Sequence, residues 1–91
     1  MGSILIIPAV GQPYQPPPGF RFADAQKAVG GYVVVVPPSR HDTSGETTIL
    51  VNEEGHGLPF NPAASLLVGR DLVGTVIVLN GKAARKQVLG D

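Results

Sequence analysis

GTVIVLNG occupies residues 74–81, and its centre is the uncharged run from Thr75 to Leu79. This run consists of β-branched and aliphatic residues, which favour strands, and the Asn-Gly pair behind it favours a turn. A strand with one wet face alternates apolar and polar residues, but this run does not alternate. We therefore predict a strand that is buried on both faces or lies at an interface. The same prediction applies to Tyr32 to Val36.

Two further segments have the composition of strands. Ile4 to Ile7 is a short aliphatic run that Pro8 stops, and Thr47 to Val51 is a second run of the same kind. The polar segment Ser39 to Glu46 joins the latter to the run that begins at Tyr32. This spacing predicts a hairpin between the second and third strands.

Two short helices are predicted from their start and stop signals. Apolar residues recur at helical spacing from Phe22 to Val29, and Gly30 follows as a residue that can turn left-handed past a helix end. Asn61 has the side chain of an N-cap, and a proline follows it at the first helical position. The second helix continues through Ala63 to Val68 and ends at Gly69.

The resulting order is β-α-β-β-α-β, in an α+β fold of the ferredoxin-like, split type. We expect a compact arrangement with two short helices on a small mixed or antiparallel sheet. At 91 residues the chain is predicted to be a single domain, 1–91. It includes a proline-rich connector, 11–19, and a basic tail, 82–91, which we expect to be a solvated extension.

The connector contains prolines at positions 13, 16, 17 and 18. Proline lacks a backbone donor and favours extended, polyproline-like geometry, so we expect a stiff surface loop. The spacing also matches PxxP, which leaves open the alternative of a ligand for a proline-recognising domain.

Charge and composition exclude several classes of function. Seven basic and seven acidic residues give a formal net charge of zero, so the domain as a whole has no field that would attract a nucleic acid, and we expect no nucleic-acid partner. The chain has no cysteine, no basic and apolar signal segment, and no apolar run of bilayer length. The expectation is a cytoplasmic protein with no membrane partner.

No catalytic or metal-binding pattern stands out. Glu53 and Glu54 are adjacent, so on an extended chain they point to opposite sides, whereas paired carboxylates must face one substrate. His41-Asp42 resembles part of a metal site, but His56 is the only other histidine and no further ligand pattern is present. We predict no enzyme activity, no metal and no cofactor.

The loop from Asn52 to Asn61 is the most informative candidate for ligand binding. Glycines let a backbone approach a ligand closely, and the loop ends at a helix N-terminus, which favours an anion. A tight turn followed by a helix cap explains the same residues without any ligand. The candidate ligand-binding residues are Arg40, His41, Asn52, Glu53, Glu54, Gly55, His56, Gly57, Asn61 and Arg70.

Five segments carry a resemblance to a known family. They are ILIIPA, GGYVVVVP, VNEEG, LPFNPAASLL and GTVIVLNG, which together span Ile4 to Gly81. In this layout the chain resembles a small domain-of-unknown-function family of phages, prophages and plasmids. The resemblance implies a mobile-element setting and a protein that acts by binding, with no catalytic residue to carry over.

Two functional hypotheses follow. The first is a binding module that sequesters a nucleotide-derived signalling molecule in counter-defence, as a homo-oligomeric sponge; it predicts a rise in thermal stability with such a ligand. The alternative is a protein-interaction or structural module that binds itself or a host protein, which requires exposed apolar area at a sheet edge or face. An enzyme would require His41, Asp42 and one of the two glutamates to meet in a single cleft.

Overall fold

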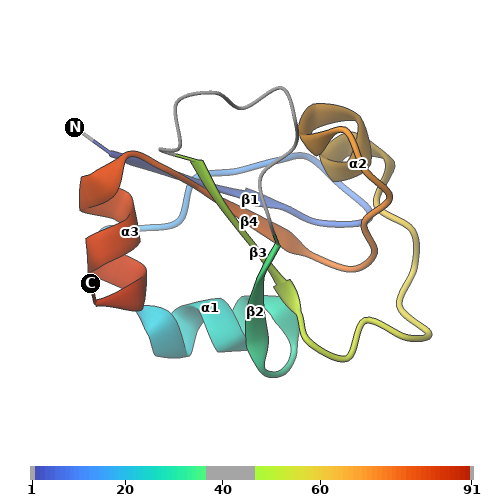
Figure 1. The fold of residues 1–91 in the computed structure, drawn as a ribbon, viewed down its shortest axis with the longest axis horizontal. Coiled ribbons are helices and arrows are strands. Elements are labelled where there is room, and N and C mark those ends of the chain that lie inside the picture. The colour runs from blue at the N-terminus through green and yellow to red at the C-terminus, as the bar shows by residue number, and fades with distance from the viewer. Residues whose placement is uncertain (1, 37–46, 91) are drawn as a thin grey trace.

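The computed structural model describes residues 2–36 and 47–90, as a four-stranded sheet with helices on both faces (Figure 1). The elements are β1 (Ser3–Ile7), α1 (Phe22–Val29), β2 (Val33–Val36), β3 (Thr47–Asn52), α2 (Pro62–Val68), β4 (Val76–Asn80) and α3 (Lys82–Leu89). The predicted bounds of α1 coincide with the observed ones, and the predicted strands agree within one residue at each end. The predicted α+β class is confirmed.

The sheet is antiparallel throughout, in the order β1-β4-β3-β2. The first six elements follow the predicted β-α-β-β-α-β order, and β2 and β3 form the predicted hairpin pair. The connections differ from the split type, in which a helix joins parallel strands with another strand between them. Here α2 joins β3 and β4, which are antiparallel neighbours, so β4 is inserted between the first and third strands.

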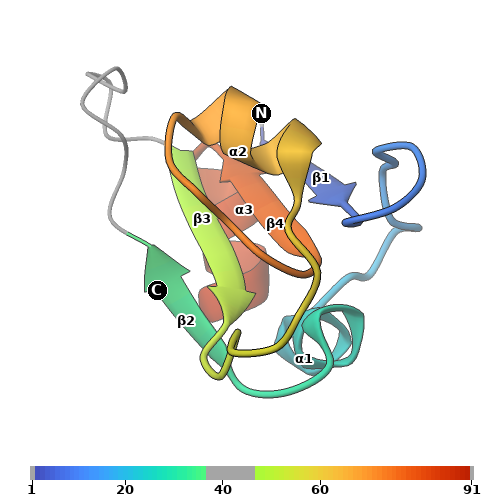
Figure 2. The same cartoon turned by 90° about the vertical axis from the view of Figure 1, so that its right-hand side faces the viewer.

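β4 lies at the centre of the fold. Ile77 and Leu79 belong to the core beneath α1 and α3, while Val76 and Val78 belong to the core beneath α2. All four side chains are buried, because successive residues of a strand point to opposite faces and both faces are covered. The prediction of a strand buried on both faces is confirmed for β4, and Figure 2 shows α2 and α3 on its two sides.

β2 has a different environment, although its sequence is equally apolar. It is the last strand of the sheet, and its side chains are only partly covered: Val34 is 42% exposed and Val35 is 45% exposed. The preceding residue, Tyr32, is 70% exposed. The sequence predicted that the run from Tyr32 to Val36 is either buried on both faces or part of an interface. The exposure of Val34 and Val35 excludes the first alternative, and the second remains a prediction.

The C-terminal segment is a helix instead of the expected solvated extension. α3 buries Ala84 and Val88, four residues apart on one face, against the core that contains Ile77 and Leu79. Lys82 and Lys86 are exposed, whereas the guanidinium of Arg85 donates to the hydroxyl of the buried Thr48 at 3.4 Å. The basic segment is therefore part of a helix whose apolar face completes the core. No helix within residues 2–36 and 47–90 has the length and hydrophobicity that a membrane crossing needs.

The proline-rich connector runs beside β1, at the opposite edge of the sheet from β2 (Figure 2). Ile6 donates its N–H to the carbonyl of Tyr14 at 2.8 Å, and Tyr14 donates its own N–H to the carbonyl of Ile6 at 2.9 Å. These two bonds attach the connector to the outer side of β1. Since prolines lack N–H groups, the residues beyond Tyr14 offer few donors that could pair with another chain.

Leu79→Ala should lower the free energy of unfolding by about 2–5 kcal/mol, because a fully buried leucine at the centre of the sheet leaves a cavity when it is truncated. Urea denaturation monitored by circular dichroism measures this loss. Val10→Ala, at a position 85% exposed, is the control and should change stability by less than about 0.5 kcal/mol. Equal effects of the two substitutions would contradict the central position of β4.

Candidate functional site

Asn61, a predicted ligand-binding residue, is fully buried, with 0% of its surface exposed. Its side-chain oxygen accepts the N–H of Ala64 at 3.0 Å, which caps α2 as the sequence predicts. Its side-chain nitrogen donates to the carbonyls of Ile7 and Gly74, both at 2.8 Å. The side chain thus ties α2 to the end of β1 and to the segment before β4, and a ligand cannot reach it in this conformation.

Asn52 also has a structural role. Its side-chain nitrogen donates to the carbonyl of Val29 at 2.9 Å, which joins the end of β3 to the end of α1. Its side-chain oxygen accepts the N–H of Glu54 at 2.7 Å, which forms a tight turn. The predicted alternative of a turn followed by a helix cap accounts for both asparagines of the loop.

The rest of the loop is spread over the surface. Glu53, Glu54 and His56 are exposed, and each glycine has a reason to be glycine that needs no ligand. A Cβ on Gly55 would lie 2.9 Å from a methyl group of Val73, and Gly57 has a φ of 87°. We therefore find no set of side chains in this loop that converges on one point.

The predicted cationic residues of the site lie only partly among the described residues. Arg40, His41 and Asp42 lie outside the described residues, so their convergence with Arg70 stays a prediction. Arg70 itself is exposed and follows α2, whose seven residues begin with a capped N-terminus. Among residues 2–36 and 47–90, no group of three acidic or histidine side chains is placed to hold a metal ion.

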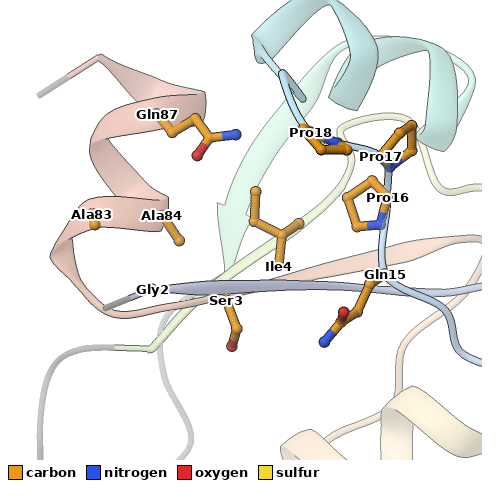
Figure 3. Close-up of a pocket in the computed structure, with 10 residues that line it drawn as sticks. All are labelled: Gly2, Ser3, Ile4, Gln15, Pro16, Pro17, Pro18, Ala83, Ala84 and Gln87. Atoms are coloured by element: carbon orange, nitrogen blue, oxygen red, sulfur yellow. The ribbon is translucent and has the colours of Figure 1, made fainter.

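Two surface hollows flank the connector, away from the predicted loop. One has a volume of about 400 Å³ and lies between the connector and the first turns of α3. Figure 3 shows Pro16, Pro17 and Pro18 facing Ala83, Ala84 and Gln87 across it, with Ile4 between them. The other, about 500 Å³, lies between the same prolines and α1. The first hollow has no charged group in its wall, and the second has only Asp24 and Lys27, so neither matches the predicted anion site.

The outer side of β2 presents a regular array of backbone groups that bond to no other described residue. In an antiparallel pair, residues alternate between those that exchange hydrogen bonds with the neighbouring strand and those whose N–H and C=O point away. Glu53 donates its N–H to the carbonyl of Tyr32, which sets the phase, since these two residues continue the register of β2 and β3. Val34 and Val36 then bond to β3, and Val33 and Val35 direct their groups outward.

The same rule, applied to β1, agrees with observed bonds. In the register of β1 with β4, the N–H and C=O of Ile6 point away from β4. Both of these groups are bonded to Tyr14. The two edges of the sheet therefore differ: the connector bonds to β1 at Ile6, while no described residue bonds to the outward groups of Val33 and Val35 of β2. We call the segment Tyr32 to Val36 the β2 edge.

The β2 edge carries no charge that would oppose pairing. Natural edges are commonly blunted by short length, lysine, proline or a bulge; β2 is short and two prolines follow it, but residues 32–36 are four valines and one tyrosine. The apolar composition of this run was visible in the sequence. Its place at the edge was not, because strand order depends on long-range pairing.

Comparisons with protein-family models, with curated proteins and with solved structures find no match for this chain. The resemblance to a family of phages, prophages and plasmids therefore stays a prediction.

Asn61→Ala should lower the free energy of unfolding by roughly 2–4 kcal/mol, because it removes a helix cap and the amide that donates to two buried carbonyls. Chemical denaturation of the variant measures the loss, and His56→Ala, in the exposed part of the loop, is the control. A variant of unchanged stability would show that Asn61 is held in place for another purpose and would reopen the ligand-binding interpretation.

Proposed function

We propose that this chain is a non-enzymatic protein-interaction module that binds a partner strand along the β2 edge. The observation that carries the proposal is the pair of outward-facing valines, Val33 and Val35, at the end of the sheet that no residue of 2–36 or 47–90 covers. A strand that pairs with them extends the sheet, as in other cases of strand addition.

The edge supplies both affinity and selectivity for such a partner. Its backbone groups bond to any extended chain, while side chains on the two faces select what lies beside them. Val34 lies on the face that α2 covers and Val35 on the face that α1 and α3 cover, since the neighbouring Val36 and Val33 pack against those cores. A partner strand with apolar side chains on both of its faces would cover both valines and remove their exposed area from water.

The two functional hypotheses make different demands on the structure, and this separates them. Strand binding requires exposed apolar area at a sheet edge, which Tyr32, Val34 and Val35 provide. Sequestration of a nucleotide requires a concave site with convergent polar groups, but Asn61 is buried and Asn52 is engaged in turns. The nucleotide-sequestering function stays a prediction that depends on Arg40 and His41.

A photoreactive benzoylphenylalanine in place of Tyr32 should form covalent adducts with the partner after illumination in cells that produce the chain. The same residue in place of Val10, which is even more exposed but lies beside the covered edge, should form none. Mass spectrometry identifies the attached chain.

A second substitution shows whether the adduct depends on strand pairing. Val35→Pro removes an N–H that points away from β3, so the native sheet keeps its bonds while the partner loses one. The adduct at position 32 should fall in this variant and persist in Val35→Thr, which keeps the N–H. An adduct that is equally strong in both variants, or no adduct at position 32, would count against strand addition.

A further inference from the structure

We infer that the strand bound at the β2 edge is β2 of a second copy of this chain, in an antiparallel pair with Val34 on a twofold axis. The inference rests on the proposed function and names its partner. Joining the two edges would make one continuous eight-stranded sheet from two four-stranded ones.

Backbone groups single out this register. With Val34 on the axis, Val33 of each copy lies opposite Val35 of the other, and each of these two pairs exchanges two hydrogen bonds. All four bonds use groups that point outward from β2. Every outward N–H and C=O of the strand then has a partner.

Neighbouring registers leave outward carbonyls of β2 without a donor. With the axis on Val35, the Val33 carbonyl would need an N–H from position 37 of the second copy, and the proline in that position has none to donate. Moving the axis to Val33 places Val35 opposite Gly31, whose N–H is already donated to the carbonyl of Gln26 at 3.0 Å. Of the three registers, the one with Val34 on the axis is therefore the one that pairs every outward N–H and C=O of β2.

The side chains of the edge are compatible with self-pairing. The twofold axis brings Val34 opposite its own copy, where a charge would meet a like charge, but residues 32–36 carry no charge and the chain has a net charge of zero. Val34 lies opposite Val34 in a pair that exchanges no hydrogen bonds, which is the closer of the two kinds of cross-strand pair.

The size of the edge sets the expected strength of the dimer. Stable interfaces bury about 1,200–2,000 Å² in total, and a four-residue strand with two half-exposed valines lies at the small end of this range or below it. We therefore expect a reversible dimer whose population rises with protein concentration.

Charge substitution at Val34 tests both the partner and the register, using the purified full chain. Val34→Lys and Val34→Glu each place like charges opposite one another, and each should weaken dimerisation about tenfold or more in sedimentation velocity. An equimolar mixture of the two variants should recover a dimer, and native mass spectrometry should identify it as one copy of each. Circular dichroism establishes that both variants fold, as expected at a position 42% exposed.

Two outcomes would overturn the inference: a wild-type chain that is monomeric at every concentration, or a mixture that dimerises no better than the separate variants. A monomeric chain that still forms an adduct with another protein at position 32 would overturn the self-pairing but leave the proposed function standing. A monomeric chain with no adduct would overturn both.

Discussion

The position of β4 between β1 and β3 is the constraint on which the rest of the structure depends. Its hydrogen bonds join the two halves of the sheet, and its side chains alternate between the core beneath α1 and α3 and the core beneath α2. Because neighbouring strands bond to both edges of β4 and helices cover both of its faces, β4 has no surface left for a partner. Any contact by the sheet with another molecule must therefore take place at β1 or β2.

The two edge strands are treated in opposite ways, and this difference connects the fold with its proposed function. The connector bonds to β1 through Tyr14, and its prolines continue past the strand without donors. β2 has no such cover among the described residues, and its exposed valines are the residues that a strand partner would bury. The proline-rich segment bonds to β1 through Tyr14, and the PxxP alternative stays a prediction.

Local signals in the sequence predicted much of the fold. Asn61 and Gly69 bound α2 because capping and left-handed turns are properties of single residues and their neighbours, and the same holds for Gly30 after α1. The sequence analysis predicted a solvated extension in place of α3 because this segment contains three cations, although Ala84 and Val88 have helical spacing. Strand order could not be predicted, since it depends on contacts between distant segments. Without the strand order, a central β4 could not be distinguished from an edge β2 of similar composition. For the candidate site, sequence reasoning identified Asn61 but could not show that its amide bonds to Ile7, 54 residues away.

Amide hydrogen exchange at single-residue resolution, measured by NMR on dilute and concentrated samples, tests the uncovered β2 edge most directly. Val34 and Val36 bond to β3, so we expect slow exchange at both concentrations. Val33 and Val35 point outward, and we expect fast exchange in the dilute sample and slower exchange in the concentrated one. Protection of Val33 and Val35 that is already complete at high dilution would show that the chain covers its own edge, and equally fast exchange at both concentrations would show that nothing pairs with it.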